Sequence, residues 1–276
     1  MKKKSVISLV SYDAAYLSES ISKYYNYVDE IILGLDKNRI TWSGNSFSFD
    51  ENKLWSELSA IDGDSKISII EEDFVKSKVA IENDNYERNF LKAQCTNDWI
   101  FSIDADEYLV NPKDFFYNYC PIVERYYNKA DICMTWATPY KTIDDTTLVI
   151  ANEDGTPFFG ENQGMTTSKD STFTYARWTN KSAAGHNRLM SPLVAIHWSL
   201  CRSKEDLHKK INNIGHSDLV ENDPFYQIWS QVTMDNYEEL HNFKSSGLGT
   251  AQWPIVRAIP SHEVANYIEQ HLDRAY

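Results

Sequence analysis

The sequence predicts an α/β domain with a largely parallel sheet covered by helices on both faces, followed by a helical C-terminal region. Short β-rich apolar runs alternate with helical stretches over roughly the first 110 residues, as in successive βαβ units. After Ala195 the apolar residues recur at helical spacing instead. We therefore expect a sheet domain over residues 1–200 and a helical extension over residues 201–276 that packs on it.

The N-terminal half contains four segments that are predicted to form the parallel strands. Each is rich in apolar and β-branched residues and is bounded by polar or turn-forming residues. In chain order they cover residues 5–10, 30–35, 66–70 and 99–103. Apolar residues at helical spacing predict a helix between the last two strands, with Asn83 or Asp84 as its cap.

The middle of the chain is predicted to change from helix to strands and then to loops. Asn111 and Pro112 are typical of a helix start, because proline is favoured at the first helical position. Residues 131–140 are predicted to form a strand that pairs with residues 147–150 across a polar turn. Residues 152–181 are rich in Gly, Thr, Ser and Asn, so we expect long loops there.

Three helices are predicted in the C-terminal region. Ser203 and Asp206 form a capping box, which indicates that a helix starts there. A second helix is expected over residues 224–243, and a third after the cap at Ser261.

Composition and charge restrict the partners that we expect. The net charge of −13 disfavours nucleic acid as a partner, because a broad basic face is missing. The N-terminal apolar run is interrupted by Ser11, Tyr12 and Asp13, too early for a secretory leader. No stretch approaches the roughly 20 apolar residues of a membrane span. We expect a cytoplasmic protein without an integral membrane segment and with four reduced cysteines.

The strongest functional signal is WIFSIDADEYL, an apolar strand that leads directly into three carboxylates. Residues 104–107 are called the acidic segment below. Asp104 and Asp106 are two residues apart, so their side chains point to the same face of an extended chain and are suited to one hard cation. The alternative is a solvated acidic turn. Without a cation or donors, we expect these carboxylates and Glu107 to repel one another.

Three stretches carry a family resemblance: VDEIILGLD, YERNFLKAQCTNDWIFSIDADEYL and AIHWSLCRSKEDLHKKINNIGHS. Together they resemble the nucleotide-sugar glycosyltransferases of the GT-A fold, particularly bacterial family 2 enzymes, over most of residues 5–216. The resemblance implies a GT-A (Rossmann-like) mixed sheet with flanking helices. It also implies hexosyl transfer from a nucleotide-sugar donor, a UDP-sugar, to a saccharide or another hydroxyl acceptor, with Mn²⁺ or Mg²⁺ as cofactor.

The metal ligands follow from the same resemblance. In such enzymes the last Asp of the DxD motif binds the cation that bridges the donor diphosphate, which implies Asp106 as a metal ligand. Asp104 is implied as a contact of the nucleotide or the metal, and His197 as a metal ligand from the C-terminal side. A structural role at a strand end is the alternative for His197. Oxygen ligands suit Mg²⁺ and Mn²⁺.

Other residues are implied as contacts of the nucleotide-sugar. Arg88 and Asn89 match the RN pair on the helix before the DxD strand, although Arg88 can instead pair with Asp84 one helical turn earlier. Asp36 resembles the acidic residue that contacts the base or ribose, and a turn-forming Asp is the alternative.

Lys210 and His216 lie on or just after the capped helix and are candidates to meet the diphosphate. For Lys210 the alternative is a solvated basic helix face.

The catalytic base is assigned to Asp154 in the loop ANEDGTP, where the Glu153 and Asp154 pair resembles that of some inverting enzymes. An inverting transferase needs a carboxylate that deprotonates the acceptor hydroxyl. Asp170 and Glu161 are rivals for this role, and a retaining enzyme would need no such base.

Two other functions remain open at this point. A sugar-phosphate nucleotidyltransferase shares the sheet architecture but has a Gly-rich basic loop after its first strand, and this chain has SYDAAYLSES there. The second alternative is a catalytically degenerate module that binds glycans or a partner protein.

Overall fold

The main sheet of the computed structural model has the mixed α/β architecture that the sequence predicts. The structure describes residues 2–127, 131–180, 188–215, 224–244 and 252–275. The sheet has five strands in the order β10-β4-β1-β2-β3. Its parallel strands are β1 (Lys4–Val10), β2 (Glu30–Asp36), β3 (Ile67–Glu72) and β4 (Trp99–Ser102). The short strand β10 (Thr166–Ser168) pairs antiparallel with β4. All four predicted parallel strands are confirmed.

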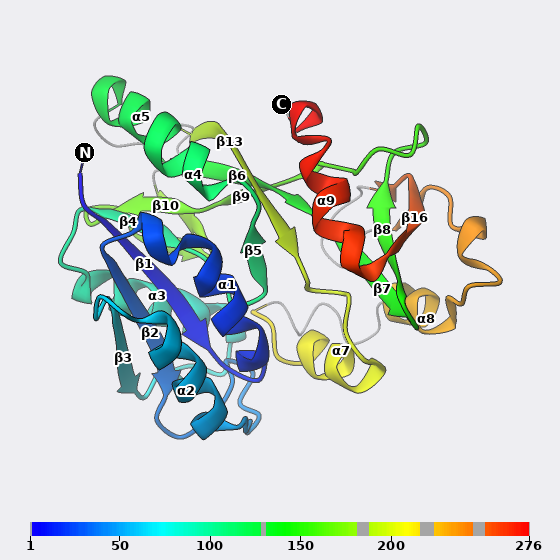
Figure 1. The fold of residues 1–276 in the computed structure, drawn as a ribbon. Helices are drawn as coiled ribbons and strands as arrows, with labels where there is room; N and C mark the ends of the chain where they lie inside the picture. The colour runs from blue at the N-terminus through cyan, green and yellow to red at the C-terminus, as the bar shows by residue number, and fades with distance from the viewer. Residues whose placement is uncertain (1, 128–130, 181–187, 216–223, 245–251, 276) are drawn as a thin grey trace.

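Helices cover both faces of this sheet (Figure 1). Because side chains alternate along a strand, Val6 and Val10 of β1 belong to one apolar cluster, and Ile7 and Leu9 belong to another. The first cluster includes residues of α1 (Leu17–Tyr24) and α2 (Glu51–Ile61), and the second includes Leu91 of α3 (Ala80–Gln94). The β1 side chains are thus buried on both faces, as expected for a central parallel strand.

The backbone of β2 approaches α3 closely at Gly34. A Cβ atom at this position would lie 2.6 Å from Leu91 Cδ1 and 2.7 Å from Glu87 Oε1. We expect Gly34→Ala to lower the free energy of unfolding by about 1–3 kcal/mol, because α3 must move away from the sheet. Urea unfolding measures this loss. Gly63→Ala is the matched control, since a Cβ there meets nothing within 4 Å; equal midpoints for the two variants would contradict the prediction.

A second sheet brings the strand before His197 beside the acidic segment. It has the order β5-β13-β6-β9, and β13 runs parallel to β6 and antiparallel to β5. Its strands are β5 (Glu107–Leu109), β13 (Arg188–His197), β6 (Asp131–Ala137) and β9 (Glu161–Gly164). The pairing of β13 with β5 places His197 directly opposite Glu107.

The C-terminal region contains strands as well as the predicted helices. β16 (Ile255–Pro260) pairs with β8 (Thr146–Ala151), which pairs with β7 (Pro139–Ile143), as the right-hand part of Figure 1 shows. The predicted pairing of residues 147–150 with a strand over residues 131–140 holds only at the end of that run, because β8 pairs with β7, whereas β6 (Asp131–Ala137) pairs with β13 and β9. The remaining elements of the region are α7 (Lys204–Ile211), α8 (Pro224–Gln231), β14 (Phe243–Lys244), β15 (Gln252–Trp253) and α9 (Val264–Glu269).

The start of α7 follows the prediction, whereas the end of α8 does not. Ser203 caps α7 and accepts a hydrogen bond from the Asp206 amide. The helix predicted to reach residue 243 ends at Gln231. Thr233 donates its amide to the Asn236 side chain, which in turn donates to the Gln231 carbonyl, so side-chain bonds replace the helical ladder.

Asparagine side chains near two helix starts have roles other than capping. α3 begins at Ala80, and the side-chain Oδ1 of Asn83 accepts hydrogen bonds from the backbone amides of Lys76 and Ser77 instead. A helical segment does start at Pro112, but the Asn111 side chain bonds the β13 backbone. The helical segments after Asn111 are α4 (Pro112–Asp114), the π-helical turn Phe115–Tyr119 and α5 (Cys120–Tyr126).

Residues 152–180 contain short strands as well as loops. β11 (Phe173–Tyr175) and β12 (Trp178–Thr179) form a hairpin. Single 3₁₀ turns cover Ala14–Tyr16, Tyr25–Tyr27, Tyr237–Glu239, Ser261–Glu263 and Leu272–Arg274.

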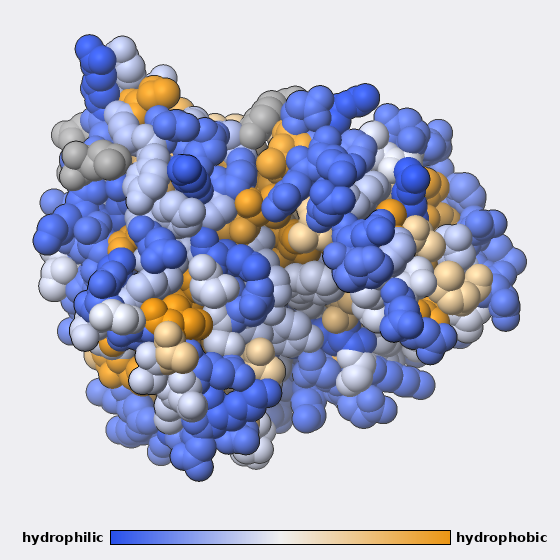
Figure 2. Space-filling model, in the orientation of Figure 1, coloured by the Kyte–Doolittle hydropathy of each residue, from blue (hydrophilic) through white to orange (hydrophobic). Residues whose placement is uncertain are grey.

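Hydrophilic residues cover most of the face shown in Figure 2, where apolar residues form separate small patches. Among the described helices, none has the length and hydropathy needed to cross a membrane.

Candidate functional site

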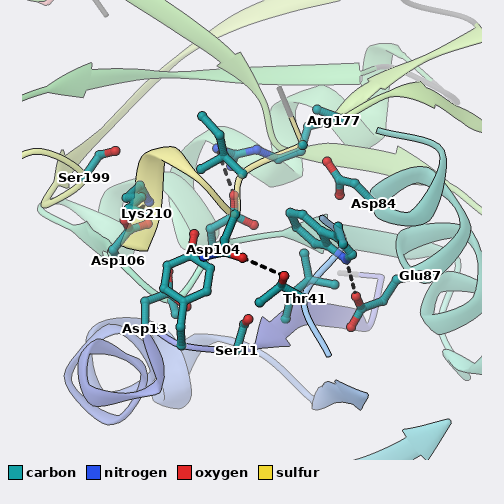
Figure 3. A pocket seen from close by; sticks show the side chains of 18 of the residues that line it. Ser11, Asp13, Thr41, Asp84, Glu87, Asp104, Asp106, Arg177, Ser199 and Lys210 are labelled. Atoms are coloured by element: carbon teal, nitrogen blue, oxygen red, sulfur yellow. Dashed lines mark hydrogen bonds and ion pairs between the residues drawn. The ribbon is translucent and has the colours of Figure 1, made fainter. Parts of the chain in front are cut away.

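A cavity of about 690 Å³ lies where three parallel strands end at their carboxyl edge. Its lining includes Asp13 after β1, Asp36 at the end of β2 and Asp104 after β4. Ligands of open α/β sheets bind at this edge, because the loops that follow the strands meet there. In Figure 3, Asp106 and Lys210 lie together on one side of the cavity, Asp84 and Glu87 lie on the other, and Asp104 lies between them.

Asp104 is held by a buried arginine. Arg88 Nη1 donates to Asp104 Oδ1 at 2.9 Å and Nη2 to Oδ2 at 3.3 Å. The same guanidinium donates through Nε to Asp84 Oδ1 at 2.6 Å, so Arg88 pairs with both carboxylates. Although burial opposes the charged form, Arg88 and Arg177 lower the pKa of Asp104 to about 2. Asp104 is therefore a carboxylate, and its side chain is 31% exposed toward the cavity.

One carboxylate oxygen of Asp106 accepts hydrogen bonds from two cationic side chains. Its Oδ2 accepts from Lys210 Nζ at 2.6 Å and from Arg202 Nη2 at 2.7 Å. Its Oδ1 faces His197 Nε2 at 3.8 Å. Burial acts to raise the pKa of Asp106, but Lys210 and Arg202 hold it below its usual range. The expectation that these carboxylates repel one another unless a cation or donors relieve them fits this arrangement, because Arg88, Arg177, Arg202 and Lys210 act as the donors.

The buried side chain of Glu107 holds the backbone of the acidic segment in place. It is fully buried, and both of its oxygens accept from the Arg177 guanidinium, with Nη1 at 2.8 Å from Oε2. Oε1 also accepts from Trp136 Nε1 at 2.8 Å, and Oε2 accepts the Asp104 amide at 2.9 Å. These bonds fully occupy Glu107, so it holds the turn that presents Asp104 and Asp106.

His197 is a neutral imidazole at the wall of the cavity. Its ring stacks on Trp136, with ring centroids 3.7 Å apart. Burial lowers the pKa of His197 to about 3, and the nearby Asp106 carboxylate opposes this only in part. A neutral imidazole can offer a ring nitrogen to a metal ion.

Four ionisable residues of the site were missed in the sequence: Asp13, Glu87, Arg177 and Arg202. Arg202 contacts Asp13 at 3.6 Å and Asp206 at 3.2 Å, and its guanidinium lies over the Tyr16 ring. The signal that could have indicated the arginines is the acidic segment, because clustered carboxylates that are buried require cationic side chains beside them. Arg202 lies five residues after His197 and just before the capping box.

Asp36 and Asn89, two of the predicted nucleotide contacts, form hydrogen bonds with the protein backbone. Asp36 lines the cavity, but its carboxylate accepts three backbone amides, from Asn38, Ile40 and Phe74. Asn89 does not line the cavity. Its amide group bonds both the amide and the carbonyl of Phe173, which attaches the β11–β12 hairpin to α3.

The structure does not bring Asp154 into the cavity. Asp154 is exposed in the turn after β8, accepts from Thr156, and lies 3.8 Å from Arg274. This local turn explains the Asp in the loop ANEDGTP without a role in proton transfer. Asp170 lies in the turn before β11 and also does not line the cavity. Glu161 is the first residue of β9, and His216 lies outside the described residues.

The residues at Asp106 fit a cation that is bound by few protein ligands. Within the part of the chain that the structure describes, no group of three or more His, Cys, Asp or Glu is arranged to hold a metal ion. Asp106 Oδ1 and His197 Nε2, however, offer one oxygen and one nitrogen on the same wall of the cavity. Mg²⁺ commonly uses one or two protein ligands together with phosphate oxygens and water.

The charged side chains around the cavity bear on whether a metal ion can bind there. Around the cavity the described carboxylates include Asp13, Asp84, Asp104, Asp106 and Glu107, and their cationic partners are Arg88, Arg177, Arg202 and Lys210. These acidic side chains outnumber their basic partners by one, but burial raises the pKa of two of them, Asp13 and Glu107. Each of the four basic side chains is already paired with a carboxylate. An anionic ligand needs additional positive charge to bind there.

Comparison with known proteins gives only distant structural similarity. No protein-family model matches the chain, and no curated protein matches it. Residues 1–349 of S. aureus TarS are 11% identical with a TM-score of 0.42, over 83% of this chain and 68% of that chain. Apo UDP-glucose pyrophosphorylase is 11% identical with a TM-score of 0.39, over 77% and 97% of the two chains. The inositol-1-phosphate CTP transferase of T. maritima is 11% identical with a TM-score of 0.36, over 78% and 98%. Because these TM-scores lie below 0.5, the likenesses carry no inference about activity.

Proposed function

We propose that the protein is a metal-dependent glycosyltransferase that moves a sugar from a nucleotide-sugar, a UDP-sugar, to a saccharide or another hydroxyl acceptor. The observation that carries the proposal is the arrangement at Asp106. One oxygen of this buried carboxylate binds Lys210 and Arg202, and the other faces the neutral His197 across one wall of a cavity at the carboxyl edge of the sheet.

The charge balance supports a diphosphate ligand that arrives with a cation. A diphosphate alone would enter a site whose four basic side chains, Arg88, Arg177, Arg202 and Lys210, are already paired with carboxylates. Bound Mn²⁺ or Mg²⁺ would stabilise the negative charge that develops on the diphosphate as the sugar leaves. Asp106 and His197 are the residues that would hold the cation.

The other residues position the donor. Arg88 orients the Asp104 carboxylate toward the cavity, where it is available to a ribose hydroxyl or to the hydration shell of the cation. Lys210 and Arg202 supply positive charge beside Asp106. A cavity of about 690 Å³ falls in the size range of small-molecule sites, which is about 300–1,000 Å³.

The nucleotidyltransferase alternative finds no support at the site. The loop after β1 contributes Asp13 to the cavity rather than glycine amides or basic side chains for a triphosphate. A degenerate binding module would not require a buried cluster of paired charges, which is costly to desolvate.

Incubation with UDP-sugars and Mn²⁺ tests the proposal, with release of free UDP as the readout. We expect slow donor hydrolysis with at least one common UDP-sugar, because water can replace the missing acceptor. UDP binding without hydrolysis of any donor would favour the degenerate module. Failure to bind any nucleotide would contradict a nucleotide-sugar enzyme.

A further inference from the structure

The two cations that share Asp106 Oδ2 differ in how firmly they are held. Arg202 has a fully buried side chain and additional contacts with Asp13, Asp206 and the Tyr16 ring. Lys210 forms its one ion pair among the described residues with Asp106, and the Asp13 carboxyl is a further acidic group in its electrostatic range. Its side chain retains 13% exposure toward the cavity. Arg202 is thus a fixed part of the site, whereas the Lys210 ammonium has one bond to exchange.

We propose that Lys210 is an exchangeable counter-ion, which neutralises Asp106 in the empty site and transfers to the diphosphate when nucleotide and cation enter together. This inference rests on the proposed function. It implies that the cation site at Asp106 and His197 becomes available only in the presence of nucleotide. Cation and nucleotide binding would then be coupled through one side chain.

Electrostatics explains the exclusion of a lone cation. The Lys210 ammonium contacts one oxygen of the carboxylate whose other oxygen faces His197. A dication at Asp106 would therefore meet a positive charge on its own ligand, with Arg202 nearby as a second one. The diphosphate removes this repulsion, because it offers Lys210 a new anionic partner.

The backbone around Lys210 suits a movement of the side chain alone. Asn213, which follows α7, accepts hydrogen bonds from Thr41 Oγ1 at 2.6 Å and from Asn45 Nδ2 at 3.1 Å. These bonds attach the end of α7 to the loop after β2 across the cavity. Lysine has a flexible stem of four carbons, so its ammonium can change partners while the helix remains in place.

The test is a titration of Mn²⁺ alone into the wild-type chain and into Lys210→Met, with free Mn²⁺ followed by electron paramagnetic resonance. We expect the variant to bind Mn²⁺ on the order of tenfold more tightly, because a cation next to the ligand is removed. UDP is then titrated at saturating Mn²⁺. There we expect the variant to bind roughly tenfold more weakly, because one charged contact with the diphosphate is lost.

Lys209→Met is the matched control, since Lys209 is an exposed residue of the same helix and does not line the cavity. It should match the wild type in both titrations, and Lys210→Arg, which keeps the charge, should match the wild type with Mn²⁺ alone. Circular dichroism checks that each variant is folded. Unchanged Mn²⁺ affinity in Lys210→Met would overturn the counter-ion role, and unchanged UDP affinity would overturn the transfer. A wild type that binds no UDP would contradict the proposed function separately, while the Mn²⁺ titration would still decide the counter-ion role.

Discussion

Asp106→Asn is expected to lower sugar transfer by about 10²–10³-fold, the scale seen when one group that stabilises developing charge is removed. Asn keeps the size and one carbonyl oxygen, but it lacks the charge that holds a hard dication against water. The residual rate should no longer depend on Mn²⁺. The measurement is transfer from a UDP-sugar in Mn²⁺ and in EDTA.

The same substitution also tests the charge pairs of the site. Asp106 neutralises Lys210 and Arg202, so its loss leaves two cations with less compensation and should lower the free energy of unfolding by about 1–3 kcal/mol. Repulsion within the acidic segment would instead predict a gain in stability. Asp154→Ala is the control, because it removes an exposed carboxylate outside the cavity and should leave transfer within about twofold. An Asp106→Asn variant with full activity would contradict the site assignment.

Arg177→Met is expected to produce the largest loss of stability, about 3–5 kcal/mol, because it leaves the fully buried Glu107 without its counter-ion. For a chain of this size the loss corresponds to a decrease in Tm of roughly 5–9 °C. Thermal unfolding followed by circular dichroism measures the change.

A double variant separates the ion pair from simple packing. Replacing both partners, as Arg177→Met with Glu107→Gln, removes the uncompensated charge and should recover most of the lost stability. Arg257→Met is the surface control, since the exposed Arg257 guanidinium donates to the Gly155 carbonyl. A double variant less stable than Arg177→Met would show that the charge of Glu107 is not the source of the loss.

The elements that hold the acidic segment were predictable because their signals are local. The strands β1, β2 and β4 each combine an apolar run with flanking turn residues, and strand order places their carboxyl ends at one edge. Asp104 and Asp106 follow one of these strands directly, so their position in the cavity follows from the strand itself. His197 ends another apolar run, and the pairing of β13 with β5 brings it to the same place.

The buried cations could not be placed in the same way, because their partners are distant in sequence. Arg177 lies 70 residues from Glu107, and Arg202 lies 96 residues from Asp106. Arg177 is carried by a hairpin turn within a polar segment that has no apolar periodicity, so nothing local distinguishes it from a loop arginine. The position of Asp154 outside the cavity could not be predicted either, because a local Asx turn produces the same sequence pattern as a functional acidic loop.

Calorimetric titration of UDP into the wild-type chain, in Mn²⁺ and in EDTA, tests the cation-assisted binding of a nucleotide diphosphate most directly. The cation bridges two anionic partners, the Asp106 carboxylate and the diphosphate, so UDP should bind at least about tenfold more tightly in Mn²⁺. Equal affinity in EDTA would remove the metal from the mechanism, and the absence of binding in both buffers would contradict the nucleotide site itself.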